Sequence, residues 1–194
     1  NVKRFIYIST SGVYGNCDGQ KVDELRKVNP ETDRAKRRVS AEIQLTNYCK
    51  QQNISLIILR VPGIYGKGRL PIDRIKSGEP IINKKESKIT NLIHVEDLAR
   101  IVVAATMSKN LSKHEIINVS DGSPISSTDY YEATGALLGI KITNYITYAE
   151  AKSIYTKKRL SFIKESRVLN VAKMFNLFPG CIKYKSIKDG IRAS

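Results

Sequence analysis

Three consecutive hydroxyl-bearing residues, Ser9, Thr10 and Ser11, directly follow the apolar run Phe5–Ile8. Hydroxyl groups can donate hydrogen bonds to the oxygen atoms of a ligand. A short, uninterrupted apolar run is typical of a strand covered on both faces, and open α/β sheets bind ligands at the carboxyl ends of such strands. A core strand that ends in an ordinary Ser/Gly turn fits the same pattern, and the spacing alone leaves both interpretations open.

These hydroxyls belong to the first of five motifs. The motifs are, in chain order, Ile8-Ser-Thr-Ser-Gly-Val-Tyr-Gly15, Leu59-Arg-Val-Pro-Gly-Ile-Tyr-Gly66, Asn91-Leu-Ile-His-Val-Glu-Asp-Leu-Ala99, Ile117-Asn-Val-Ser-Asp121 and Asp189-Gly-Ile-Arg-Ala193. Together they resemble the extended short-chain dehydrogenase/reductases, the NAD-dependent epimerase/dehydratase family. The resemblance implies that Thr10 polarises the substrate, that Ser9 contacts the cofactor, and that Ser11 and Tyr14 contact the substrate.

The catalytic pair of that family is altered in this chain. Short-chain dehydrogenases use a Tyr as general acid/base and a Lys four residues later, on the same helix face, that lowers the Tyr pKa and holds the ribose. The register set by Ala41-Glu42 places Arg34 at the Tyr position and Arg38 at the Lys position. A guanidinium donates hydrogen bonds but supplies no base, so we expect Arg34 to anchor an anionic substrate and Arg38 to hold a ribose or a phosphate. Alternatively, both are solvated helix charges.

The segment from Thr32 to Glu42 is similar to an atypical subgroup of the family that keeps the fold but lacks the Tyr/Lys pair. By the same resemblance, Pro62, Gly63 and Ile64 lie beside the nicotinamide. A plain Pro-Gly turn also explains these three residues.

Asn91 and His94 are the remaining candidates, and the resemblance places them in the stretch that joins the substrate subdomain to the core. We expect them to contact the substrate. The structural alternative is that His94 caps the helix that begins at Val95.

Composition bounds the class of protein. A hydrophobic content of 41% over 194 residues fits a globular protein, and no run approaches the roughly 18 apolar residues of a membrane span. The three cysteines, Cys17, Cys49 and Cys181, indicate neither a zinc site nor a disulfide framework, so we expect a reducing, cytoplasmic environment. The 33 Lys+Arg outnumber the 18 Asp+Glu, but aromatics are not interleaved with the densest basic cluster, Arg34–Arg38, which makes nucleic acid an unlikely partner.

An α/β pattern must position these residues. The apolar run at the start, a helix from about Asp33 to Gln51 and a strand over Ile54–Leu59 form a βαβ unit. Later segments predict short strands and helices, among them one helix over Thr147–Lys157. We therefore expect the C-terminal part of a Rossmann-like doubly wound parallel sheet plus a small α+β substrate-side subdomain. The expected division is residues 1–66 for the core and 67–194 for the subdomain, interleaved with the last core strands.

No Gly-rich strand–turn–helix opens the chain, although a dinucleotide fold needs one for the pyrophosphate. By resemblance, the first strand is a late strand of the family's sheet, so the chain is expected to be a fragment. The expected function is that of an epimerase/dehydratase-like or reductase-like protein that binds NAD or NADP and acts on a nucleotide sugar or a small carbonyl compound. The alternatives are a non-catalytic dinucleotide-binding relative, which the loss of Tyr/Lys favours, and a basic nucleic-acid-binding protein, which only the charge favours.

Overall fold

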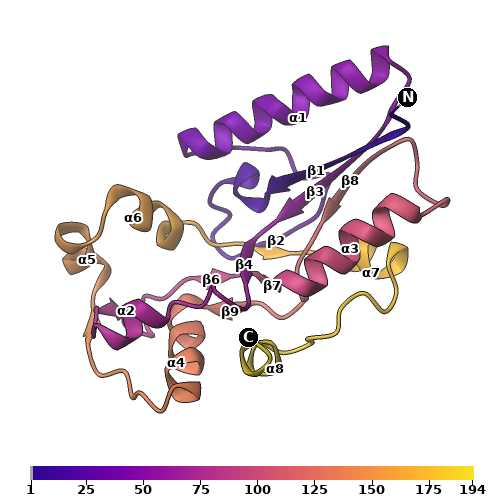
Figure 1. The fold of residues 1–194 in the computed structure, drawn as a ribbon. Coiled ribbons are helices and arrows are strands. Elements are labelled where there is room, and N and C mark those ends of the chain that lie inside the picture. The colour runs from indigo at the N-terminus through magenta and orange to yellow at the C-terminus, as the bar shows by residue number, and fades with distance from the viewer. Residues whose placement is uncertain (1) are drawn as a thin grey trace.

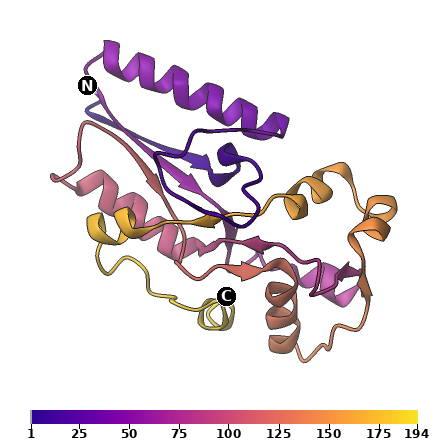
Figure 2. The same ribbon diagram turned by 180° about the vertical axis from the view of Figure 1, so that it is seen from behind.

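The computed structural model describes residues 2–194, and a three-stranded parallel sheet lies at its centre (Figure 1). The strand order is β1(Arg4–Thr10)-β3(Ser55–Val61)-β8(His114–Asn118). Helix α1(Asp33–Gln51) covers one face and α3(Val95–Met107) covers the other, as the views from both sides show (Figures 1 and 2). Coverage on both faces explains the apolar composition of β3, and it confirms the predicted α/β class with a parallel sheet.

Helix α1 begins where the sequence predicts. The Thr32 hydroxyl accepts a hydrogen bond from the backbone N–H of Ala35 at 3.2 Å and so caps the helix. The buried positions of α1 are Ala35, Glu42 and Cys49, seven residues apart, because seven residues complete almost two helical turns. Ile43, the residue after Glu42, points away from the sheet and is 56% exposed.

A second group of short elements extends from the carboxyl end of the sheet. It contains β4(Gly63–Tyr65) paired with β7(Leu92–His94), β5(Ile81–Ile82) with β10(Tyr145–Ile146), β6(Ile89–Thr90) with β9(Ile125–Ser126), and the helices α2(Ile72–Lys76), α4(Ser127–Leu137), α5(Tyr148–Ile154) and α6(Lys157–Lys164). The chain returns to the core through β11(Val168–Leu169), which pairs with β2(Lys21–Val22), and ends in α7(Ala172–Leu177) and α8(Ile187–Arg192). The division near residue 66 stays a prediction.

The prediction of one continuous helix over residues 147–157 is wrong, because the helix is interrupted at Tyr155. Tyr155 has an extended backbone, with φ −87° and ψ 147°, and Thr156 then caps a new helix, α6. The sequence Thr156-Lys-Lys-Arg159 supplies this cap, since the Thr156 hydroxyl accepts from the Arg159 N–H. The break turns α6 back toward the N-terminal end of α1 (Figure 1).

The described residues 2–194 contain no helix long and apolar enough to cross a membrane. Within the same range, no group of three or more His, Cys, Asp and Glu side chains could hold a metal ion.

The outer edge of β1 has no strand paired with it among residues 2–194, and Phe5 on this strand is 37% exposed. Unpaired edge groups are templates for pairing with another chain, so we expect the 194-residue chain to form homodimers or larger assemblies in light scattering. Phe5→Lys should shift the population toward monomer, whereas Phe175→Lys, at a comparably exposed position on α7, should not. A monodisperse monomer of the unchanged chain would contradict this expectation.

Candidate functional site

A cavity of about 400 Å³, hereafter the cleft, opens at the carboxyl ends of β1 and β3. It brings together nine of the eleven residues that the sequence singled out, namely Ser9, Thr10, Ser11, Arg34, Arg38, Pro62, Gly63, Ile64 and Asn91. Parallel strands end at one edge of a sheet, which is why motifs far apart in the chain meet here. Tyr14 and His94 do not line the cleft.

Thr10 is the last residue of β1 and the N-cap of a short 3₁₀ helix, η1(Ser11–Tyr14). Its hydroxyl oxygen accepts a hydrogen bond from the Gly12 N–H at 3.1 Å. This contact uses an oxygen lone pair and leaves the hydroxyl proton available for a ligand. Thr10 is therefore held in position as a hydrogen-bond donor at the wall of the cleft.

Ser9 forms part of a buried polar network beneath the cleft. Its hydroxyl donates to Glu42 Oε1 at 2.5 Å. Glu42 in turn accepts two hydrogen bonds from Arg60, 3.2 Å from Nε and 2.8 Å from Nη2, in the bidentate geometry that guanidinium and carboxylate favour. The network fixes the end of β1 against α1 and β3.

Tyr14 extends the same network away from the cleft. It is 1% exposed, accepts a hydrogen bond from Arg60 Nη1 at 3.0 Å and donates to Asn118 Oδ1 at 2.8 Å. Burial raises the pKa of its hydroxyl. Tyr14 therefore bridges β3 and β8 in the interior, on the far side of the network from the cleft.

Arg34 and Arg38 extend from one face of α1 into the cleft, as their spacing of four requires. The Arg34 guanidinium stacks over the Phe162 ring of α6, with 4.0 Å from Cζ to the ring centroid. Arg38 Nη1 donates to the Tyr7 hydroxyl at 3.0 Å. Neither arginine has a carboxylate within 4.0 Å among the described residues.

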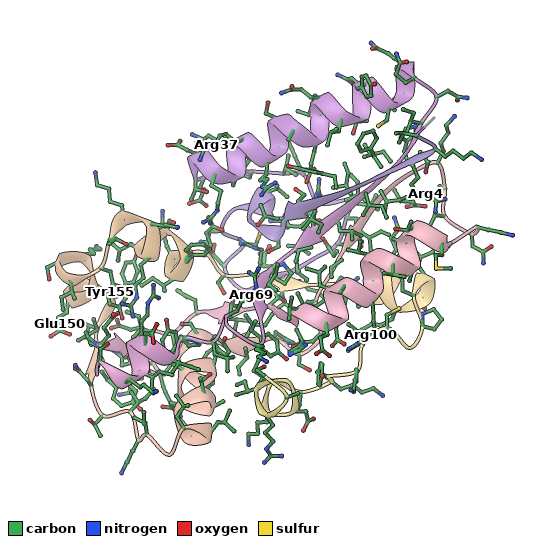
Figure 3. The ribbon with its side chains drawn as sticks, in the orientation of Figure 1. Arg4, Arg37, Arg69, Arg100, Glu150 and Tyr155 are labelled. Atoms are coloured by element: carbon green, nitrogen blue, oxygen red, sulfur yellow. The ribbon has the colours of Figure 1, made fainter. Side chains whose placement is uncertain are left out.

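Three further charged side chains, which no sequence motif indicated, line the cleft. Arg69 lies near the centre of the molecule, close to β4 (Figure 3), and has no carboxylate partner within the described residues. Arg167 and Glu165 pair with each other at 2.8 Å. Only the C-terminal segment folding back onto β2 brings this pair to the cleft, and no local pattern in the sequence signals it.

Asn91 and His94 both make structural contacts. The Asn91 side chain donates to the Arg167 carbonyl and accepts from the Leu169 N–H, each at 2.9 Å, so it ties the residue before β7 to the segment that contains β11. His94 is 1% exposed and caps α3 by accepting from the Glu96 N–H at 3.3 Å. Burial lowers the pKa of its imidazole.

The resemblance assigns Pro62, Gly63 and Ile64 to the nicotinamide end of NAD, and the structure shows where these residues lie. Pro62, Gly63 and Ile64 follow the carboxyl end of β3, beside Ser9 and Thr10 at the end of the paired strand β1, and all five residues line the cleft. Residues 2–194 contain no glycine-rich strand–turn–helix ahead of β1 that would bind the pyrophosphate. The described residues thus fit one end of the dinucleotide.

Several known proteins are similar to this chain. A structure of a functionally unknown conserved protein from Silicibacter pomeroyi aligns with 98% of this chain and 65% of its own chain, at 28% identity and a TM-score of 0.85. The UDP-glucuronic acid 4-epimerase of Bacillus cereus, solved with UDP-glucuronic acid and NAD, aligns with 100% of this chain and 60% of its own, at 24% identity and a TM-score of 0.79, which shows a shared fold. The human dTDP-D-glucose 4,6-dehydratase is 31% identical over 70 residues, 36% of this chain and 20% of the human protein.

The chain spans less than two thirds of the length of each of these relatives. The sequence model of the NAD-dependent epimerase/dehydratase family matches residues 1–120, which is more than half of the chain and includes β1, α1, β3 and β8. The match confirms the resemblance carried by the strand-end motifs, and the chain belongs to the NAD-dependent epimerase/dehydratase family.

Proposed function

We propose that the cleft binds a nucleotide sugar beside NAD or NADP, and that the protein is an epimerase/dehydratase-like or reductase-like member of an atypical short-chain dehydrogenase subgroup without the Tyr/Lys pair. The observation that carries this proposal is the set of cleft arginines, Arg34, Arg38 and Arg69, that have no carboxylate partner among the described residues. Guanidinium groups bind phosphate and carboxylate oxygens with paired hydrogen bonds. A cytoplasmic location, expected from the cysteine usage, is part of the proposal.

A second cavity of about 370 Å³ adjoins the cleft, and both cavities are lined by Gly63, Thr90, Phe162 and Glu165. Its wall contains Tyr130, Tyr131 and Tyr155 together with basic residues such as Arg74. Aromatic rings and apolar surface suit a nucleobase and ribose, and the cations suit a diphosphate. The two cavities together have room for a substrate longer than a small carbonyl compound.

Within the cleft, Thr10 and Arg34 would stabilise negative charge on a substrate oxygen. Donors held in place around a developing charge commonly contribute a large part of catalysis. Arg34 cannot act as a base, because its guanidinium stays protonated. No Tyr, His or Lys side chain lines the cleft within residues 2–194, so proton transfer would fall to the substrate, to water or to a group outside this chain.

The lack of a Tyr, His or Lys side chain in the cleft within residues 2–194 also favours a second candidate function, that of a non-catalytic dinucleotide-binding relative. Among residues 2–194, Glu165 is the only carboxylate that lines the cleft, and it forms an ion pair with Arg167. Turnover with UDP-glucose or UDP-glucuronic acid in the presence of NAD or NADP separates the two candidates, because a binding module would bind and not convert them.

The experiment that tests the catalytic proposal substitutes Arg34 in the complete protein. Arg34→Ala should lower turnover on the order of 100-fold if the guanidinium stabilises charge at the reacting oxygen. Arg34→Tyr should not restore a dehydrogenase pH profile, because position 38 lacks the lysine that lowers the tyrosine pKa. Arg37→Ala is the matched control, since Arg37 lies on the same helix but lines a groove on its outer side. Unchanged turnover and affinity in Arg34→Ala would contradict the proposal.

A further prediction concerns the 194-residue chain by itself. We expect it to bind NAD weakly, because residues 2–194 supply the nicotinamide end of the site and not the glycine-rich turn whose N–H groups hold the pyrophosphate. Calorimetric titration is the measurement. A micromolar dissociation constant for NAD would contradict this prediction.

A further inference from the structure

The stack between Arg34 and Phe162 leaves most of the arginine unused. Among residues 2–194, the Arg34 side chain makes no hydrogen bond and no salt bridge, and its guanidinium lies over the face of the Phe162 ring. A contact with an aromatic ring occupies no hydrogen-bond acceptor, so the five N–H donors of the guanidinium, which lie in its plane, have no acceptor among residues 2–194. Arg34 thus presents a free, planar donor edge at the cleft.

The ring fixes the orientation of that edge. Phe162 is 57% exposed and lines both the cleft and the adjoining cavity, so it contributes little to the core of the protein. Helix α6, which carries it, has no buried residue. Besides the stack, α6 is joined to the start of α1 by the ion pair between Lys164 and Glu31, at 3.4 Å. Both contacts hold α6 against the N-terminal end of α1, beside Arg34.

A fixed guanidinium edge matches a carboxylate better than it matches a hydroxyl. A carboxylate accepts two parallel N–H bonds from the fork, and each bond to an ionised acceptor is stronger than a bond to a neutral one. Arg34 and Thr10 line the same cavity, so a substrate unit that contacts Thr10 occupies the space into which the arginine extends. Two donors would hold the carboxylate and three would remain for the neighbouring oxygen.

We infer that the substrate carries a carboxylate on its reacting unit, a sugar acid in chemical class, that Arg34 binds this carboxylate, and that Phe162 is the positioning residue that holds the Arg34 plane. This inference rests on the proposed function and narrows it from nucleotide sugars in general to those with an acidic sugar. The specificity determinant is then the residue that stands where the family's tyrosine would be.

The test compares UDP-glucuronic acid with UDP-glucose, two probes that share the uridine diphosphate and differ at one carboxylate. Calorimetric titration of the complete protein should give roughly 10- to 100-fold tighter binding of UDP-glucuronic acid, the range for a bidentate charge-assisted contact. We call the quotient of the two dissociation constants, UDP-glucose over UDP-glucuronic acid, the ratio. Arg34→Ala should abolish the ratio, because it should weaken the binding of UDP-glucuronic acid and change the binding of UDP-glucose little. Arg37→Ala, on the outer side of α1, should preserve it.

Two substitutions test the positioning role. Phe162→Leu keeps an apolar side chain but removes the aromatic face, and it should reduce the ratio by about 2- to 5-fold. Phe162→Trp keeps the face and should preserve the ratio. It also introduces the only tryptophan of a chain whose sequence has none. Emission from this indole should change when Arg34→Ala is added, and identical emission in both backgrounds would overturn the stack.

The titrations distinguish a failure of the carboxylate inference from a failure of the proposed nucleotide-sugar function. If the wild-type protein binds both probes equally, or if Arg34→Ala weakens both to the same extent, the carboxylate inference is wrong and the proposed nucleotide-sugar function stands. If neither probe binds, the proposed function fails and the inference fails with it.

Discussion

Arg60→Ala is expected to lower the free energy of unfolding by about 3–5 kcal/mol. Arg60 is 4% exposed, and its guanidinium pairs with Glu42, which is 6% exposed, and donates to Tyr14. Removing the arginine leaves the Glu42 carboxylate in the interior without its counter-charge, and that uncompensated charge causes most of the loss. Urea denaturation followed by circular dichroism measures the effect.

Two control variants test whether the loss of stability comes from the unpaired Glu42 carboxylate. The double variant Glu42→Leu/Arg60→Met replaces both charges with apolar groups of similar bulk and should recover most of the lost stability, as such replacements commonly do. Lys84→Ala, which breaks the exposed ion pairs with Glu132 and Asp129, should change the free energy of unfolding far less than Arg60→Ala does, because exposed ion pairs are screened by solvent. An Arg60→Ala loss as small as the Lys84→Ala loss would show that the network does not stabilise the end of β1.

Asp121 is expected to make the protein less stable as the pH rises from about 4 to about 7. The residue is 4% exposed, and its Oδ2 atom has no hydrogen-bond partner among the described residues. Burial first, and then the charge of Asp97, raise the pKa of Asp121 to about 7 from its ordinary 3.8, while the hydrogen bond from the Ser123 N–H partly opposes the shift.

The direction follows from proton uptake. Between these two pKa values the folded protein holds a proton on Asp121 that the unfolded chain has released, so raising the pH favours unfolding. Each unit of the shift corresponds to about 1.4 kcal/mol, so the whole interval lowers the free energy of unfolding by up to about 4 kcal/mol. Above pH 7 both states are ionised at this residue and the contribution stays constant.

Asp121→Asn should remove this pH dependence and stabilise the protein at pH 8, because the amide has a similar shape and does not ionise. The quantity to measure is the difference in unfolding free energy between variant and wild type at pH 5 and pH 8, since other carboxyls, such as Glu115 with its lowered pKa, make their own contributions of opposite sign. The same change at Asp73, exposed on α2, serves as the control. If the unfolding free energies of variant and wild type differ by the same amount at pH 5 and pH 8, Asp121 is already ionised in the folded protein at pH 5 and the prediction is wrong.

The sequence by itself determined the local elements and the residue types at one end of the sheet. The apolar run before Ser9 predicts β1, the helical pattern from about Asp33 predicts the start of α1, and the strand-end motifs predict the family. The spacing of four between Arg34 and Arg38 places both in the cleft. These features depend on hydrogen bonds and side-chain periods within a few residues, which a sequence displays directly.

Only the tertiary structure decided what surrounds those residues. Phe162 and Arg167 reach the cleft because the helix ends at Tyr155 and the chain returns through β11. No residue pattern near Arg34 in the sequence indicates either feature. In the same way, packing turned the side chains of Tyr14 and His94 into the interior, where burial and backbone partners occupy their polar atoms. The physical reason is that a motif specifies residue type and local backbone, whereas the direction in which a side chain finds its partners depends on contacts between segments distant in the chain.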